Sequence, residues 1–280
     1  MNSFPTKSQR KKYYQDEGKI DYQNHLYGNP SDWIHHRIKN LSLKWLKSIL
    51  REMKKPLVLD IGCAEGLYLR EINSLIQRGR GIDIALNKIK RARKKSRQFS
   101  QLEFVSGDFL DHQFKEKKFN LIFSTETLEH IPDIEKTLRK INSLLSGGGI
   151  FLVSVPTDKE AVFYRFRPDW KKASGHLYNW SKKEFIRLLE RAGFEVAGSR
   201  GVNNVATQII AKILSFILRR RRERSEKEQK RKIIGKEIKG TSISQLTKGA
   251  KIFYQLDSLF TSLPILKRIN NYNIFICQKK

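Results

Sequence analysis

Short apolar segments alternate with helix-like segments from residue 56 to residue 200 of this 280-residue chain. The alternation predicts an α/β fold, with a doubly wound, mostly parallel sheet covered by helices on both faces. Ligands of such sheets bind where the strands end, so functional residues should follow the strands. The predicted strands are 57–61, 79–84, 102–108, 119–124, 150–156, 194–200 and 272–279.

The segments around these strands carry helix signals. The first predicted helix repeats apolar residues on one face, so it should pack on the sheet. The glycines at 147–149 favour a helix end just before them. Ser181 and Glu184 have the spacing of a capping box, which marks a helix start. The predicted helices are 33–51, about 66–77, 86–99, 133–145 and 181–193.

The composition allows one large α/β domain, or one domain with an appendage. No apolar run reaches the roughly 18–20 residues that span a bilayer, and the N-terminus lacks the apolar region of a secretory signal. The two cysteines, Cys63 and Cys277, are far apart, so neither a disulfide framework nor a cysteine-based zinc site is expected. We therefore expect a cytoplasmic protein.

The net charge is +28, and one basic cluster, KIKRARKKSR, occupies 88–97. Such a charge attracts polyanions, namely RNA, DNA or anionic lipid headgroups. A lysine-rich background with solvated helix faces explains the same charge, because the excess is spread along the chain. No DNA partner is expected.

A loop of small residues follows the first predicted strand. Asp60 precedes it, and Gly62, Ala64 and Gly66 let a ligand approach the backbone before a helix starts. Asp83 ends the second strand, and a carboxylate there can accept hydrogen bonds from both hydroxyls of a ribose. Loop and carboxylate together fit any nucleoside cofactor.

The loop resembles motif I, Asp-x-Gly-x-Gly-x-Gly, of the class I S-adenosylmethionine-dependent methyltransferases, with Ala64 in place of the middle glycine. Later segments resemble, in order, the ubiquinone/menaquinone-type or "type 11" small-molecule branch. The match covers about 57–200. Its further parts are Asp83, Gly107-Asp108-Phe109, 119–122, Thr127-Leu128-Glu129-His130-Ile131-Pro132, 145–149, 176–181 and 188–194.

This resemblance implies a Rossmann-like methyltransferase with a seven-stranded sheet and S-adenosyl-L-methionine as cofactor. Asp83 would bind the ribose, and Asp108 with Phe109 would bind the adenine. The implied cofactor-binding residues are Asp60, Gly62, Ala64, Gly66, Asp83, Ile84, Asp108, Phe109, Ser124 and Thr125.

Methyl transfer from a sulfonium is an in-line displacement, so proximity and alignment supply most of the rate. A general base is needed only if the acceptor must lose a proton. His130, after the fourth strand, and His176, after the fifth, are the candidate catalytic bases. Alternatively, His130 serves hydrogen bonding at the helix entry. His35 and His36 are expected to be structural, and no metal site is predicted.

The fourth strand lacks the Asp/Asn-Pro-Pro-Tyr/Phe motif of amino methyltransferases that act on nucleobases or glutamine amides. Its absence favours transfer to oxygen or carbon of a small-molecule, lipid-linked or saccharide acceptor. One alternative is an RNA methyltransferase acting on tRNA or rRNA, which the positive charge supports. Another is a catalytically silent methyltransferase-like binding protein.

About seventy residues, 201–271, separate the last two predicted strands, where this class usually has a short hairpin. The predicted divisions are an arm and helix at 1–52, a cofactor-binding core at 53–200, this insertion, and a last strand at 272–280. The insertion should start beside the substrate mouth, because the sixth strand should run parallel to the others.

Within the insertion, 205–239 joins an apolar helical stripe to a basic run. Three interpretations compete: a cap over the substrate pocket, a helix on an anionic membrane at its inner face, and an RNA-binding arm. Residues 219–239 contain no aromatic side chain, which argues against RNA.

Two further segments have open roles. Tyr13, Tyr14, Tyr22 and Tyr27 either form a lid over the cofactor or only pack. Residues 163–170 either form a substrate wall, with Arg165 or Arg167 meeting an anionic acceptor, or a solvated loop.

Overall fold

The computed structural model describes residues 8–9, 12, 33–115, 118–157, 176–204 and 270–280. The predicted roles of the N-terminal tyrosines, of 163–170 and of the 205–239 segment fall outside these described residues. Within them, no helix has both the length and the apolar character needed to cross a membrane.

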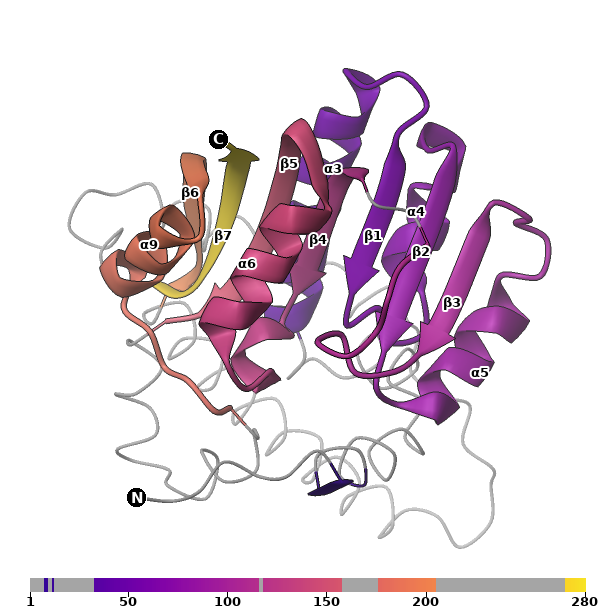
Figure 1. The fold of residues 1–280 in the computed structure, drawn as a ribbon, viewed down its shortest axis with the longest axis horizontal. Helices are drawn as coiled ribbons and strands as arrows, with labels where there is room; N and C mark the ends of the chain where they lie inside the picture. Colours follow the sequence, from indigo (N-terminus) through magenta and orange to yellow (C-terminus); the bar gives the residue numbers. More distant parts are fainter. Residues whose placement is uncertain (1–7, 10–11, 13–32, 116–117, 158–175, 205–269) are drawn as a thin grey trace, which may run out of the picture.

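Seven strands form one sheet in the order β3-β2-β1-β4-β5-β7-β6 (Figure 1). The pairs from β3 through β5 are parallel, and β7 is antiparallel to both β5 and β6. This confirms the predicted mostly parallel, seven-stranded Rossmann-like sheet. The strands are β1 Leu57–Ile61, β2 Arg78–Asp83, β3 Leu102–Ser106, β4 Phe119–Thr125, β5 Leu145–Pro156, β6 Phe194–Asn204 and β7 Asn270–Lys279.

Helices cover both faces of the sheet. On one face, α3, α4 and α5 pack over alternate strand residues such as Val58, Leu121 and Leu152. On the other face, α6 and α9 pack over their neighbours Leu59 and Ile122. Strands that are apolar on both faces therefore place the sheet between two cores. The helices are α3 Trp33–Arg51, α4 Leu67–Glu71, η2 Asn73–Leu75, α5 Leu86–Lys95, η3 Leu128–His130, α6 Ile134–Leu144 and α9 Lys182–Arg191.

The predicted capping box at the start of α9 is confirmed. The Glu184 backbone N–H donates to Ser181 Oγ at 3.2 Å, and the Ser181 N–H donates to Glu184 Oε2 at 2.7 Å. These hydrogen bonds lower the pKa of the Glu184 carboxyl. A local sequence signal is sufficient here because both partners lie in one helical turn.

Several boundaries differ from the prediction. The helix predicted at about 66–77 is divided into α4 and η2, and the helix predicted at 86–99 ends at Lys95. β6 extends through 201–204 and β7 begins at Asn270, so both ends of the predicted insertion belong to the sheet. Their glycine and asparagine residues hide the strands from a search for apolar runs. β5 begins at Leu145, before the glycines expected to form the turn. Leu145 pairs with Phe119, and the register then shifts over the glycines so that Ile150 pairs with Leu121.

Candidate active site

The loop after β1 holds three left-handed residues in five positions. Gly62, Ala64 and Gly66 have φ of 76°, 46° and 73°. The Gly62 and Cys63 N–H groups both donate to the carbonyl of Ile82, at 2.8 and 3.1 Å. The loop is thus fixed to the end of β2. Ala64 tolerates a backbone geometry that costs a residue with a Cβ about 1 kcal/mol.

Gly62 also permits a close approach between two strand ends. A Cβ built on it would lie 2.1 Å from Thr127 Oγ1, far inside contact distance. Thr127 follows β4 and donates its hydroxyl to the carbonyl of Thr125 at 3.0 Å. Glycine at this position is therefore required by packing as well as by conformation.

The predicted ribose ligand, Asp83, orders the loop. Its Oδ2 accepts from the Ala64 N–H at 2.9 Å, and its Oδ1 accepts from the Ala85 N–H at 2.8 Å. Each carboxylate oxygen has a second lone pair that can still accept a hydroxyl. Ile84, between these contacts, is half-buried and presents an apolar side chain at the same edge.

Asp60, at the end of β1, is a buried carboxyl group with 1% exposure. Within the described chain its Oδ2 has no hydrogen-bond partner. Burial first, and the charge of Asp83 second, raise the pKa of Asp60 well above its ordinary value. A buried acceptor without a donor beside a backbone loop indicates that a ligand supplies the donor. The loop, Asp60 and Asp83 therefore fit a nucleoside cofactor.

Glu65, within the same loop, ties it to the basic helix α5. The carboxylate is buried, and it meets Arg91 Nε at 2.6 Å and Lys95 Nζ at 2.5 Å. Arg93 donates to the carbonyl of Phe104 through Nε and Nη2, at 3.0 and 2.7 Å. Part of the 88–97 cluster therefore has a structural role, although its side chains stay partly exposed.

The predicted adenine residues lie after β3. Asp108 Oδ1 accepts from the Leu110 N–H at 3.0 Å, which shapes the turn. The ring of Phe109 is 4% exposed, packs near Phe114 and lies 5.2 Å below Lys140 Nζ. The ring of Phe109 therefore belongs to the hydrophobic core.

The end of β4 contacts both the neighbouring strand β1 and the helix α3. Ser124, a predicted cofactor residue, is buried and donates to the carbonyl of Ile61 at 3.1 Å. Thr125 follows it at the strand end, half-buried. Glu126 Oε1 then lies 2.7 Å from His35 Nδ1 of α3. No local sequence pattern indicates this contact, because 91 positions separate the two residues.

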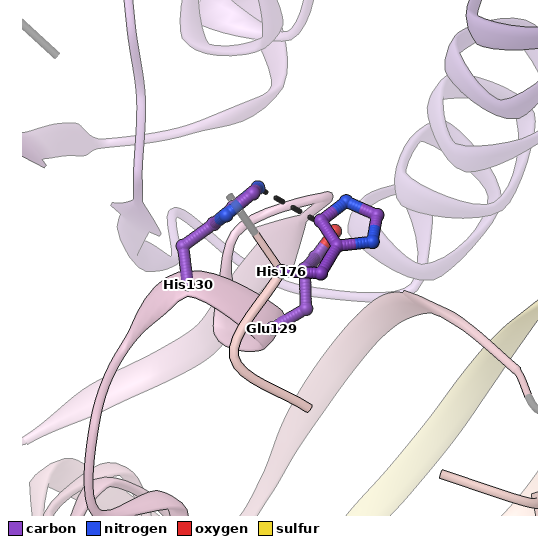
Figure 2. Close-up of side chains that lie close together, drawn as sticks. All are labelled: Glu129, His130 and His176. Carbon is purple, nitrogen blue, oxygen red and sulfur yellow. Dashed lines mark ion pairs between the residues drawn. The ribbon is translucent and has the colours of Figure 1, made fainter. Parts of the chain in front are cut away.

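The two candidate bases come together at this edge. The imidazole rings of His130 and His176 have centroids 4.9 Å apart, and Glu129 lies beside them (Figure 2). Asp133 caps the following helix α6, because its carboxylate accepts from the Lys136 N–H at 3.0 Å. Glu129 is part of the motif that resembles the methyltransferases, but the sequence alone predicted no function for it.

Known proteins resemble the chain over most of this sheet. A family model described as "Methyltransferase domain" matches residues 33–198. Carboxy-S-adenosyl-L-methionine synthase of Helicobacter pylori (strain P12) is 28% identical over 193 residues, 58% of this chain and 78% of that protein. Sterol 24-C-methyltransferase of Saccharomyces cerevisiae is 35% identical over 111 residues, 37% of this chain and 28% of that protein.

Solved structures also share the fold at low identity, as the following example shows. N-methyltransferase NodS of Bradyrhizobium japonicum WM9, in complex with S-adenosyl-L-homocysteine, has a TM-score of 0.58 and 16% identity. The superposition covers 96% of this chain and 98% of that one. At this identity the likeness concerns the architecture of the sheet and its helices.

Proposed function

This chain belongs to the methyltransferase domain family, and we propose that it methylates an oxygen or carbon atom of a small-molecule, lipid-linked or saccharide acceptor. It is an enzyme whose cofactor is S-adenosylmethionine, as the sequence motifs predicted. That cofactor supplies a methyl group on a positively charged sulfur. The family and the cofactor are shown, and the chemical class of the methyl acceptor is what we propose.

The observation that carries the proposal is the junction of the Gly62 loop with Thr127. There the cofactor loop after β1 touches the segment after β4 that leads to Glu129 and His130. Groups at this junction can hold a methyl donor and an acceptor side by side. Positioning of this kind supplies most of the rate in an in-line displacement.

The residues of the cofactor loop would divide the binding between them. Asp83 would accept from the ribose hydroxyls, and its bonds to Ala64 and Ala85 hold the carboxylate in place. Ile84 and Asp108 would flank the adenine. Asp60 would accept a hydrogen bond at the floor of the loop, where its Oδ2 now meets no donor within the described chain.

On the acceptor side, β4 ends at Thr125 and is followed by Glu126-Thr127, and this segment lacks the motif of amino methyltransferases. His130 and His176 lie close together just after β4 and on the segment that leads to α9, and this position supports a role beside the acceptor. Either imidazole could accept a proton from a hydroxyl or an acidic carbon. Both features support an oxygen or carbon acceptor.

The RNA alternative rests on the positive charge, and three residues of the basic helix, Arg91, Arg93 and Lys95, also bind groups of the fold. Peripheral contact with an anionic membrane through 205–239 stays a prediction. At matched salt, sedimentation with anionic liposomes tests the membrane contact, and sedimentation with bulk tRNA tests the RNA contact. The protein should sediment only with the partner that it binds.

The cofactor site is tested by calorimetric titration with S-adenosylhomocysteine. We expect Asp83→Ala to weaken binding about 100-fold, because charged hydrogen bonds contribute about 1.5–3 kcal/mol each. Glu190→Ala, on the exposed face of α9, is the control and should bind as the wild type does. Equal affinity of Asp83→Ala and wild type would show that the cofactor binds elsewhere.

The acceptor is tested by comparing metabolites of a strain with and without the gene. An acceptor that accumulates one methylene lighter in the deletion strain supports methyl transfer and gives its chemical class. Purified enzyme should then methylate it. Conversion of the cofactor itself into a carboxylated product, with no methylated acceptor, would instead favour the activity named for the Helicobacter relative. Cofactor binding with neither product would favour the silent alternative.

A further inference from the structure

Two imidazoles and one carboxylate gather outside the cofactor loop. Glu129 and His130 lie on η3, just after β4, and His176 lies on the segment that leads to α9 (Figure 2). One ligand atom from each side chain lies within 4.8 Å of the other two. His130 Nε2 and Glu129 Oε1 are 4.0 Å apart.

This spacing suits a shared cation. Zinc binds imidazole nitrogen and carboxylate oxygen at about 2.0–2.2 Å, which sets the ligand atoms about 3.3–3.5 Å apart in a tetrahedral site. The atoms here need to approach by roughly 1 Å, and side-chain rotation provides that. Two histidines with one carboxylate are a donor set that takes divalent zinc, manganese or iron and leaves open positions.

Backbone hydrogen bonds hold the two contributing segments together. The Leu177 N–H donates to the carbonyl of Glu129 at 2.8 Å, directly beside two of the three side chains. The His130 N–H donates to the carbonyl of Thr127 at 3.0 Å. The Asp133 N–H donates to Tyr178 Oη at 3.0 Å. The fold therefore holds the backbone that carries the three side chains in a defined arrangement.

The burial of the Glu129 carboxylate also favours cation binding. Its side chain is 1% exposed, whereas His130 keeps 18% of its surface open. A buried carboxylate attracts a cation more strongly than an exposed one does, because water screens the charge less. The more open histidine leaves a path by which an ion and an acceptor can enter.

We propose that Glu129, His130 and His176 bind one divalent transition-metal ion, and that this ion holds the oxygen atom of the methyl acceptor. The inference rests on the proposed methyl transfer and narrows its acceptor atom to oxygen. It departs from the sequence-based expectation of no metal site. A metal-bound imidazole nitrogen cannot accept a proton, so the ion replaces the base role of both histidines.

The ion acts as a Lewis acid, which lowers the pKa of a bound hydroxyl. The acceptor hydroxyl releases its proton to solvent, and its oxygen forms a bond to the methyl carbon. The bond from that carbon to sulfur breaks with its electron pair passing to sulfur. The products are the methyl ether, S-adenosylhomocysteine and one proton, so no further reactant is needed.

Metal binding is measured on the full chain after chelation and dialysis, by calorimetric titration with Zn²⁺. We expect about one ion per chain. His130→Ala and His176→Ala should each lower the affinity about 100-fold, because each removes one of three ligands. His112→Ala is the matched control, since His112 packs against Phe114 away from the cluster. It should bind Zn²⁺ as the wild type does.

Titration with S-adenosylhomocysteine on the same samples separates this inference from the proposed function. The ligand variants should keep cofactor affinity within about twofold, since they remove no loop contact. Wild type that binds S-adenosylhomocysteine but no Zn²⁺ overturns the metal site alone. Wild type that binds Zn²⁺ but no S-adenosylhomocysteine overturns the cofactor assignment and leaves the metal site standing.

A second measurement needs no substitution, in case the variants do not fold. X-ray absorption of the Zn²⁺-loaded wild type counts imidazole ligands directly. Two imidazoles with one or more oxygen ligands are expected. Fewer than two imidazoles, or sulfur ligation, overturns the site.

Discussion

The cofactor half and the acceptor half of the site are built differently. The cofactor half comprises β1, β2, β3 and the loops that follow them, and main-chain bonds such as Gly62 N–H to Ile82 carbonyl organise it. The acceptor half comprises η3, the end of β4 and 176–181, and side chains from distant segments form it. A backbone loop suits a cofactor of fixed shape, whereas side chains can vary with the acceptor.

Buried carboxylates show the same contrast. Asp60 and Glu65 in the cofactor half lie within the loop or at its start, and Glu65 is paired with Arg91 and Lys95. Glu129 in the acceptor half lies beside two histidines that could share a cation with it. The charge of Glu65 thus fixes the loop in the first half, whereas Glu129 in the second half faces the two histidines.

The largest expected effect comes from Gly62→Ala, which breaks the contact between the halves. The new Cβ would meet Thr127 Oγ1 at 2.1 Å in a backbone conformation with φ of 76°. We expect a loss of about 3 kcal/mol in the free energy of unfolding, from overpacking and strain together. Urea unfolding measures it.

The control for this change is Gly147→Ala, where a Cβ would meet nothing within 4 Å. It should alter the free energy of unfolding by about 0.5 kcal/mol or less. Similar losses in both variants would mean that the halves are not packed as tightly as the distance between Gly62 and Thr127 implies.

A smaller effect is expected for Glu65→Gln, which removes the charge that anchors the cofactor loop to α5. Arg91 and Lys95 would lose their partner, and at 27% and 31% exposure they would be only partly rehydrated. We expect a loss of about 2 kcal/mol in the free energy of unfolding. Thermal and urea unfolding at low and high salt measure it.

Glu135→Gln is the comparison for this change. Glu135 lies on α6, is 49% exposed, and pairs with Arg139 and Arg191. Exposed pairs contribute little, so the loss should be about 0.5 kcal/mol or less. If both substitutions cost the same, burial of Glu65 does not strengthen its ion pairs.

The smallest expected effect comes from replacing Asp60, and this substitution should raise the free energy of unfolding instead of lowering it. Burial raises the pKa of Asp60, so the folded state holds this proton more tightly than the unfolded state does. Stability from this group is therefore present in acid and is lost as the pH rises above the ordinary value of 3.8 and through the raised pKa.

Asp60→Asn removes that titration. We expect it to be more stable than the wild type by about 1 kcal/mol at neutral pH, with a smaller difference in acid, while cofactor affinity falls. Urea unfolding across pH, with Asp111→Asn as the exposed control, measures the difference. A difference independent of pH would show that Asp60 does not titrate between the two states.

Local patterns predicted much of the cofactor half. The strands at 57–61 and 119–124 stood out because residues buried on both faces are apolar in sequence. The positions of Gly62, Gly66 and Asp83 were predictable because a turn and a strand end impose their own spacing. Edge-strand residues 201–204 were missed, since glycine and asparagine pair through the main chain without an apolar signature.

The sequence by itself determined the alternation of strands and helices, the loop at 62–66 and the cap at Ser181, because each depends on residues close together in the chain. Only the tertiary structure decided that β7 lies between β5 and β6, that His35 meets Glu126, and that His176 joins Glu129 and His130. These contacts join residues tens of positions apart. No local pattern encodes them, because packing of the whole sheet chooses which loops meet at its edge.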